Sequence, residues 1–167
     1  ANNFGFKKDI DVIYPLDLCN FFPTIEIAGK CNLFCKTCDM GLPNANKGKG
    51  HMSLTLFKLI IEKLAREIPF INSVALYIWG EPLLNKNLSK MIKICKEFGI
   101  ATEISTNLNF QKYLEDVIDS EPEQMVLPCA GTGKIYERGR TGGQWEKFLS
   151  GCKKIRSMID SKNKDIN

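Results

Sequence analysis

The residues best suited to chemistry in this sequence are three closely spaced cysteines. Of the chain's 7 cysteines, Cys31, Cys35 and Cys38 form the motif Cys-x-x-x-Cys-x-x-Cys. A compact loop with this spacing can turn three thiolates toward three irons of a cubane cluster, which normally takes four thiolates. The fourth iron would then stay open to a chelating ligand. We therefore predict that these cysteines are the protein ligands of one 4Fe-4S cluster.

Two other interpretations of the motif stay open. Zinc in a structural site takes four ligands, and Cys19 or His51 could supply the fourth. The three cysteines could also be free thiols in a turn. A disulfide framework is not expected, because it needs spaced, even-numbered partners and an export signal.

The other cysteines are assigned by their surroundings. Cys95 and Cys152 lie on apolar helical stripes, so we expect them to be small core residues. Cys19 and Cys129 have no assigned role, and Cys129 follows an expected strand and could face a cavity. His51 lies in a segment rich in Gly and Lys, which favours a structural or exposed residue over a ligand.

Hydrophobic periodicity indicates strands that alternate with amphipathic helices. The segment 24–28 alternates and contains β-branched residues, which is typical of a strand, and further strands are expected at 73–79, 100–105 and 124–128. Ser53 is a suitable N-cap for the first helix. The apolar stripes of the four helices are Phe57, Ile60, Ile61, Leu64 and Ile68; Leu88, Met91, Ile92 and Cys95; Phe110, Tyr113, Leu114 and Val117; and Trp145, Phe148, Leu149, Cys152 and Ile155.

Four successive strand–helix units imply parallel strands with helical crossovers. We therefore expect an α/β fold, a partial (β/α) barrel of about four units, with its sites at the carboxyl ends of the strands. The expected organisation is an N-terminal extension at 1–23, a core at 24–160 and a polar tail at 161–167.

Polar motifs follow the later strands of this array. Trp79-Gly80-Glu81-Pro82 closes the second strand, Ser105-Thr106-Asn107 ends the third, and the segment 136–143 follows the fourth. Each has a plain structural interpretation as well. Glu81 could be a solvated loop carboxylate, and Asn107 could cap the next helix.

Together these motifs resemble the radical S-adenosylmethionine (radical SAM) superfamily over about residues 24–150. In that family the cysteine motif follows the first strand, Gly-Gly-Glu-Pro closes the second, and Ser-Thr-Asn-Gly often ends the third. The segment 136–143 resembles the one after the fourth strand in members with a SPASM extension. The resemblance implies the N-terminal part of the core domain of a SPASM-like radical SAM enzyme.

The resemblance also implies which residues contact S-adenosylmethionine. They are Thr37, Trp79, Gly80, Glu81, Pro82, Ser105, Asn107 and Arg140. In the family, the segment matching 79–82 binds the amino group, and an arginine at the place of Arg140 pairs with the methionine carboxylate. Arg138 is an equal chemical candidate two residues away.

The sequence departs from the family pattern at four places. Thr37 stands where the family often has an aromatic residue near the adenine, so only its backbone could serve. Trp79 replaces the first glycine of Gly-Gly-Glu-Pro, and Leu108 replaces the glycine after Asn107. Pro-Cys-Ala-Gly at 128–131 replaces Ser-Val-Ser-Gly, which removes two hydroxyls that could contact the cofactor.

Composition excludes several other classes of protein. The net charge is only +4, and no basic run is dense enough to follow a phosphate backbone, so nucleic acid is not an expected partner. No apolar run approaches the roughly 18 residues that a membrane span needs. The first 14 residues are mixed and charged, unlike a signal peptide. We therefore expect a reducing, cytoplasmic location.

The predicted function is reductive cleavage of S-adenosylmethionine at a 4Fe-4S cluster, which yields a 5′-deoxyadenosyl radical that takes hydrogen from an unidentified substrate. The alternatives are a zinc-binding interaction module and a cluster-binding fragment without turnover. The resemblance implies an electron donor such as flavodoxin or ferredoxin. It also implies a fragment, because related cores have six strand–helix units, so a partner chain or a missing C-terminal half is expected.

Overall fold

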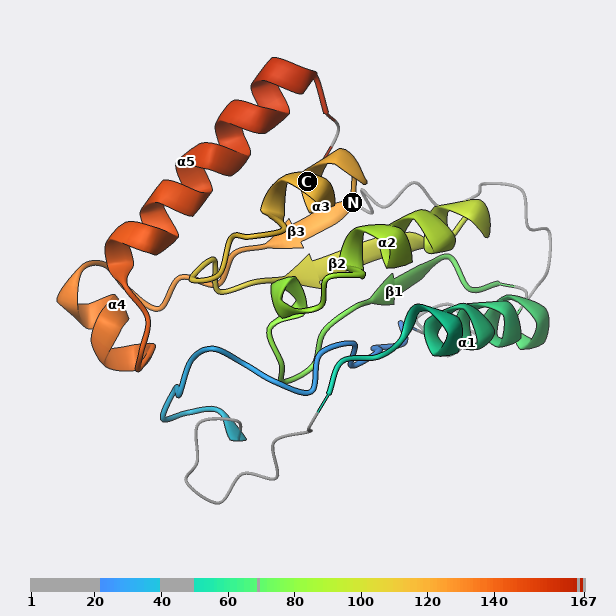
Figure 1. Cartoon of the computed structure of the whole chain (residues 1–167), viewed down its shortest axis with the longest axis horizontal. Helices are drawn as coiled ribbons and strands as arrows, with labels where there is room; N and C mark the ends of the chain where they lie inside the picture. The colour runs from blue at the N-terminus through green and yellow to red at the C-terminus, as the bar shows by residue number, and fades with distance from the viewer. Residues whose placement is uncertain (1–21, 40–49, 69, 165, 167) are drawn as a thin grey trace.

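The computed structural model describes residues 22–39, 50–68, 70–164 and 166. Most of the expected N-terminal extension, with Cys19, lies outside these ranges. Figure 1 shows short strands that alternate with helices. In chain order the elements are α1 (Leu54–Glu67), β1 (Ser73–Ala75), the short 3-10 helix η3 (Pro82–Leu84), α2 (Leu88–Glu97), β2 (Ala101–Ser105), α3 (Leu114–Asp119), β3 (Gln124–Val126), α4 (Lys134–Gly139) and α5 (Trp145–Lys162).

The three strands form one parallel sheet in the order β1-β2-β3. Its register pairs Ala75 with Glu103 and Glu103 with Gln124. Helices α2 and α3 connect successive strands, so all carboxyl ends meet at one edge of the sheet. The expected α/β fold with parallel strands is confirmed. The expected barrel of four units is not shown, because the described strands form a small open sheet.

The first expected strand, 24–28, is only a short extended segment. Thr24 forms a single parallel bridge with Ala75, where the Ile25 N–H donates to the Ala75 carbonyl at 2.8 Å. Beyond it the carbonyl of Ile27 accepts instead from Met52 N–H at 3.0 Å and from the Asn85 side chain at 2.9 Å. The chain therefore leaves the sheet edge before a ladder can form.

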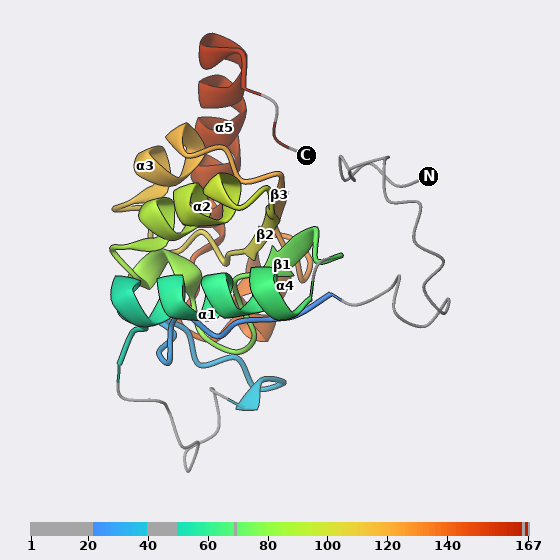
Figure 2. The ribbon, with the colours of Figure 1, turned by 90° about the vertical axis from the view of Figure 1, so that its right-hand side faces the viewer.

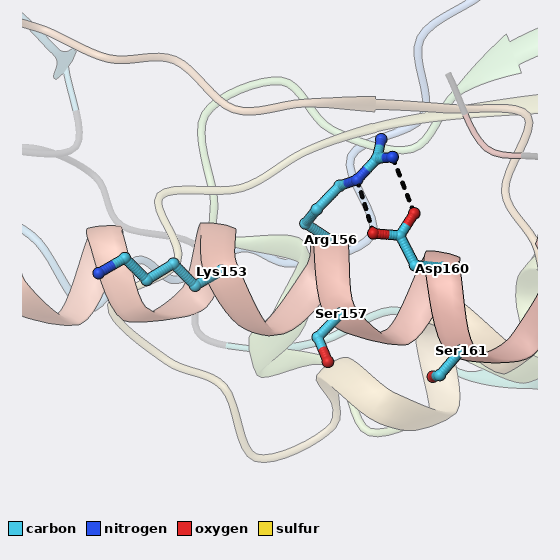
Figure 3. Close-up of a pocket in the computed structure, with 5 residues that line it drawn as sticks. All are labelled: Lys153, Arg156, Ser157, Asp160 and Ser161. Carbon is cyan, nitrogen blue, oxygen red and sulfur yellow. Dashed lines mark hydrogen bonds and ion pairs between the residues drawn. The ribbon is translucent and has the colours of Figure 1, made fainter.

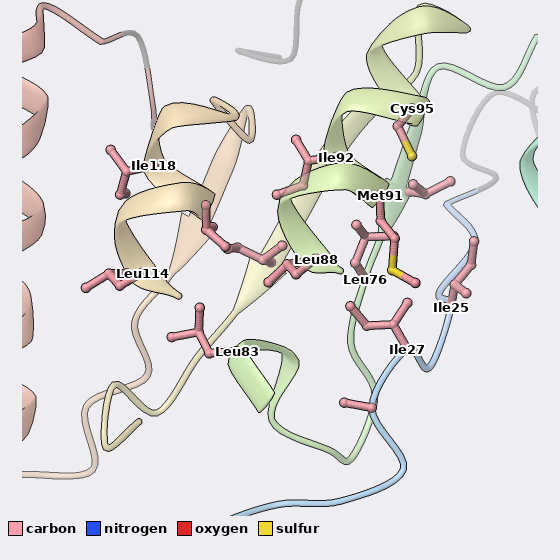
Figure 4. Packing of buried hydrophobic residues seen from close by; sticks show 14 of the residues in the cluster. Ile25, Ile27, Leu76, Leu83, Leu88, Met91, Ile92, Cys95, Leu114 and Ile118 are labelled. Atoms are coloured by element: carbon pink, nitrogen blue, oxygen red, sulfur yellow. The ribbon is translucent and has the colours of Figure 1, made fainter. Parts of the chain in front are cut away.

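Burial alternates along the central strand and separates the two faces of the sheet. On β2, Thr102 and Ile104 are buried, whereas Glu103 and Ser105 are partly exposed. Helices α1, α2 and α3 lie along one side of the sheet (Figure 2). Figure 4 shows apolar side chains of α2 and α3, such as Met91 and Leu114, in one cluster with Leu76. Each fully buried Leu or Ile stabilises the fold by about 1.5–3 kcal/mol.

Local signals set most helix boundaries. The Ser53 hydroxyl accepts from Leu56 N–H at 3.2 Å, which confirms the expected N-cap of α1. The third helix begins only at Leu114, after Phe110, and α5 continues to Lys162, beyond the expected start of the tail at 161. Helix α4 was not expected, because Tyr136 is its one buried residue and it has no apolar stripe.

No helix in the described ranges is long and apolar enough to cross a membrane.

Candidate functional site

The strand ends and the cysteine loop enclose a cavity of about 150 Å³. Its lining brings together most of the residues that the sequence singled out. The lining residues are Cys31, Leu33, Cys35, Cys38, Tyr77, Ile78, Trp79, Gly80, Glu81, Ser105, Thr106, Asn107, Pro128 and Arg140. Segments far apart in the chain therefore meet at the carboxyl edge of the sheet, as parallel topology requires.

Backbone contacts hold the cysteine loop at this edge. The Phe34 N–H donates to the Thr141 carbonyl at 2.8 Å, and the Cys38 N–H donates to the Cys35 carbonyl at 3.1 Å. The Cys31 sulfur accepts from Leu33 N–H at 3.5 Å. Burial raises the pKa of the Cys31 thiol, and the Leu33 N–H acts in the opposite direction. The loop is therefore shaped by its own amides and by the segment before α5.

The donor set fits an iron–sulfur cluster in type. Cys31, Cys35 and Cys38 are free thiols that open into one cavity, and thiolates are the usual ligands of such clusters. In the described ranges, no three His, Cys, Asp or Glu side chains already converge tightly enough to hold a single metal ion. Of the two candidate fourth ligands for zinc, Cys19 lies outside the described residues, and His51 is exposed and off the lining. Cys129, which could have faced the cavity, is exposed and off the lining as well.

Glu81 is buried where the ends of β1 and β2 meet. Its carboxylate accepts from the Thr106 hydroxyl at 2.7 Å, from Asn107 N–H at 2.9 Å and from Leu83 N–H at 3.1 Å. Burial raises the pKa of Glu81 to about 7, although the three hydrogen bonds and Arg140 act in the opposite direction. The side chain thus links the turn after β1 to the end of β2, and it is not a solvated loop residue.

The turn at Trp79 and Gly80 is clamped to the segment before the cysteines. Glu26 Oε2 accepts from Trp79 N–H at 2.6 Å and from Gly80 N–H at 3.1 Å. The Glu81 N–H donates to the Lys30 carbonyl at 2.9 Å. A Cβ on Gly80 would lie 1.6 Å from the Ala28 carbonyl oxygen, so only glycine fits there.

Glu26 is a site residue that sequence reasoning missed. Its signal was a carboxylate in an otherwise apolar extended segment, between the buried Ile25 and Ile27. In an extended chain successive side chains point to opposite faces, so Glu26 turns away from the core. Thr106 and Tyr77, which line the cavity, were likewise not predicted as site residues, whereas Glu26 lies off the lining and acts through the turn at Trp79 and Gly80.

Asn107 connects the end of β2 to the cysteine loop. Its amide nitrogen donates to the Asn32 side-chain oxygen at 3.1 Å and approaches the Cys31 sulfur at 3.7 Å. Its side-chain oxygen accepts from Asn109 N–H at 2.8 Å, and the Asn109 amide donates to the Tyr136 hydroxyl at 2.8 Å. A polar chain therefore runs from Tyr136 on α4 to the first cysteine.

The structure separates the two candidate arginines. Arg140 lines the cavity and donates to the Pro128 carbonyl at 3.1 Å, whereas Arg138 is exposed and off the lining. Two expected contact residues also lie off the lining. Thr37 is exposed in the cysteine loop, and Pro82 is buried at the start of η3.

A second depression lies on the surface of α5 (Figure 3). Every lining residue comes from that one helix: Lys153, Arg156, Ser157, Asp160 and Ser161. Arg156 and Asp160 pair with each other at 2.8 Å across one helical turn. Such exposed pairs are weak, and the depression is a space between surface side chains.

The fold is similar to that of solved radical SAM enzymes. Streptococcus suis SuiB bound to S-adenosylmethionine matches with a TM-score of 0.66 at 19% identity, over 82% of this chain and 31% of SuiB. HydG, a maturase of the [FeFe]-hydrogenase, matches with a TM-score of 0.64 at 12% identity, over 82% of this chain and 32% of HydG. At these identities the likeness is one of fold.

Two further matches also extend to sequence. BtrN in complex with AdoMet and 2-DOIA has a TM-score of 0.56 at 25% identity, over 64% of this chain and 44% of BtrN. The S-adenosyl-L-methionine-dependent 2-deoxy-scyllo-inosamine dehydrogenase of Niallia circulans is 30% identical over 74 residues, which are 44% of this chain and 29% of that enzyme. No family model matches the chain.

The two matches that extend to sequence support a relationship to radical SAM enzymes, and the matches to SuiB and HydG show the same fold. The chain spans less than a third of the curated relative and less than half of BtrN.

Proposed function

We propose that this chain is a radical SAM core that binds a 4Fe-4S cluster through Cys31, Cys35 and Cys38. The observation that carries the proposal is the common cavity, which the three thiols share with the ends of β1 and β2. When bound, the cluster supplies one electron that cleaves S-adenosylmethionine and yields a 5′-deoxyadenosyl radical. The protein's part is to place the reacting groups and to exclude water.

The remaining lining would hold S-adenosylmethionine. A carboxylate offers about four acceptor positions. Three donors already occupy three of these positions on Glu81. The position left would face the ammonium of the bound methionine group, beside Trp79 and Gly80. Ser105, at the end of β2, and Asn107, two residues beyond it, would contact the same molecule. Arg140, which lines the same cavity, would pair with the carboxylate of the methionine group.

The SPASM-like branch is part of the same proposal. Its support is the segment 136–143, which packs onto the cysteine loop. The Thr141 carbonyl accepts from Phe34 N–H at 2.8 Å, and a Cβ on Gly142 would lie 3.7 Å from the Phe34 ring. A donor such as flavodoxin or ferredoxin would supply the electron.

Anaerobic reconstitution with iron and sulfide tests the proposal. Single Ala variants of Cys31, Cys35 and Cys38 should lose the visible absorbance and the bound iron, because each removes one ligand. Cys129→Ala is the matched control, since that thiol is exposed and off the lining, and it should keep both. The reduced wild type should release 5′-deoxyadenosine from S-adenosylmethionine.

The same samples test the zinc interpretation. A colourless protein that retains zinc, and that loses it equally in Cys19→Ala or His51→Ala, would overturn the cluster assignment. A brown protein that binds S-adenosylmethionine without releasing 5′-deoxyadenosine would indicate the fragment without turnover.

A further inference from the structure

The sulfur of the first motif cysteine accepts hydrogen bonds to which the proposed function gives no role. Cys31 Sγ accepts from Leu33 N–H at 3.5 Å and from the Asn107 side-chain nitrogen at 3.7 Å. Leu33 lies in the cysteine loop itself, whereas Asn107 reaches the sulfur from beyond the end of β2. The contact from Asn107 is therefore a tertiary one, and the fold has to hold it in place.

The hydrogen bonds of the Asn107 amide fix its orientation. Its oxygen accepts from the Asn109 backbone N–H at 2.8 Å. A backbone N–H can only donate, so the amide oxygen must lie on that side and the nitrogen must face the cysteine loop. That nitrogen carries two N–H groups. One donates to the Asn32 side-chain oxygen at 3.1 Å, and the other remains for Cys31.

Tyr136 on α4 holds the backbone that carries this amide. Its hydroxyl donates to the Asn107 carbonyl at 3.3 Å and accepts from the Asn109 side-chain nitrogen at 2.8 Å. Both Tyr136 and Asn107 are buried. Buried polar networks with every member bonded are rigid, so the amide is held toward the sulfur.

We propose that Asn107, oriented by Asn109 and Tyr136, donates a hydrogen bond to the ligating sulfur of Cys31 and thereby raises the reduction potential of the cluster. A cluster gains negative charge when it is reduced, and hydrogen bonds to its sulfurs are one of the factors that set its potential. A donor to such a sulfur stabilises the reduced form more than the oxidised form. This inference rests on the proposed function, because it takes Cys31 as a cluster ligand.

Redox titration of the reconstituted full chain tests the inference. The cluster takes up one electron from a chemical reductant, and the EPR signal of the reduced form is followed against potential without S-adenosylmethionine. Asn107→Leu removes the donor and adds no charge. We expect its midpoint to fall, so that the ratio of reduced to oxidised cluster at the wild-type midpoint drops roughly tenfold, which is about 59 mV for a one-electron couple. An unchanged midpoint would overturn the inference.

Two further variants separate the hydrogen bond from a general loss of structure. Asn87→Leu is the matched control, because the Asn87 side chain makes no cap bond and lies off the cavity lining, and it should keep the wild-type midpoint. Tyr136→Phe removes the hydroxyl that positions Asn107. It should retain bound iron and lower the midpoint by less than Asn107→Leu does. A wild-type midpoint in Tyr136→Phe would refute the positioning role.

A measurement on the wild type keeps the test decisive if Asn107→Leu does not fold. Pulsed EPR of the reduced cluster, in chain labelled with ¹⁵N in the side-chain amides of asparagine, should show a coupling to nitrogen. Asn107→Asp keeps the shape of the side chain and an oxygen for Asn109 N–H, and it should lose that coupling. A wild type without the coupling, or a coupling that persists in Asn107→Asp, would overturn the inference.

The outcomes distinguish this inference from the proposed function. A chain that assembles no cluster refutes both of them. A chain that assembles the cluster and releases 5′-deoxyadenosine, but whose midpoint is the same in Asn107→Leu, keeps the proposed function and refutes the role of Asn107.

Discussion

Three glutamates, of which only Glu81 lines the cavity, differ in the groups that hold their carboxylates. Glu26 accepts backbone N–H groups from Trp79 and Gly80. Glu81 is buried among three donors, and its pKa is raised to about 7. Glu103 bonds to a single phenol. Glu26 positions a turn, Glu81 links that turn to the end of β2, and Glu103 holds the Tyr77 hydroxyl.

Glu26 gives the first prediction at the residue scale. Glu26→Ala removes the acceptor for two backbone N–H groups, which should cost about 1–3 kcal/mol of unfolding free energy. Glu26→Gln should cost less, because one amide oxygen can accept both. Urea unfolding and calorimetric titration with S-adenosylmethionine measure the two effects. Equal losses of stability in both variants, or no loss in either, would contradict the hydrogen bonds from Trp79 and Gly80 to Glu26. Glu97→Ala, on the exposed end of α2, is the control and should leave stability unchanged.

Glu81 gives a prediction about pH. Its folded pKa of about 7 lies above the ordinary 4.5, so the folded chain holds the proton more tightly than the unfolded chain. That contribution to stability is present below pH 4.5 and is lost as pH rises through about 7.

The metal-free wild type should therefore lose up to about 3 kcal/mol relative to Glu81→Gln between pH 4.5 and pH 8. Urea midpoints in the presence of a thiol reductant measure the difference. A difference that stays constant with pH, or that changes in the opposite direction, would show that the carboxylate is already ionised in the acid range.

At the scale of elements, the turn after β1 brings the cysteine segment against the sheet. Gly80 meets the Ala28 carbonyl oxygen so closely that a Cβ would lie 1.6 Å from it. The Lys30 carbonyl accepts from Glu81 N–H one residue further on. The segment 25–30, which leaves the sheet edge after Thr24, is therefore held by the turn at Gly80 and Glu81 and not by a strand ladder.

Gly80→Ala should therefore displace the cysteine segment. The clash is with backbone, which cannot rotate away, so we expect a loss on the order of 3 kcal/mol and weaker retention of iron. Gly50→Ala is the matched control, because nothing lies within 4 Å of a Cβ there. Unfolding midpoints and bound iron are measured for both. Similar behaviour of the two variants would refute the close approach.

At the scale of the whole molecule, the sheet has an open side at β3. Within the described ranges β3 pairs with β2 alone, and Gln124, Met125 and Val126 are all partly exposed. An unpaired strand edge is a template for pairing with another chain.

We therefore expect the isolated chain to self-associate through β3. Light scattering after size exclusion should show a mass that rises with concentration. Met125→Lys should not serve as the test, because Met125 packs on the core. The Val126 carbonyl accepts from Thr106 N–H, so the backbone of Val126 faces β2 and that of the next residue, Leu127, faces the open edge. Leu127→Pro removes an N–H from this edge and should lower the association, whereas Ile104→Pro, in the central strand β2, should impair folding itself. A wild type that stays monomeric at all concentrations would contradict the expectation.

The chemistry-bearing residues and most elements could be predicted from the sequence. The cysteine motif, the strand–helix alternation and the polar residues after each strand are local patterns, because burial periodicity and spacing are written in neighbouring residues. Parallel topology places the carboxyl ends of the strands at one edge of the sheet. The order of strands and helices therefore predicts that the residues after each strand share one cavity.

The tertiary structure alone decided what depends on distant contacts. The short pairing of 24–28, the clamp by Glu26 and the three donors to Glu81 each join segments with no local signal for one another. The choice of Arg140 over Arg138 depends on how α4 ends against Pro128. The pairing of strands and the contacts between side chains depend on which surfaces meet in the folded chain. Residues that are neighbours in the sequence carry no signal of these distant partners.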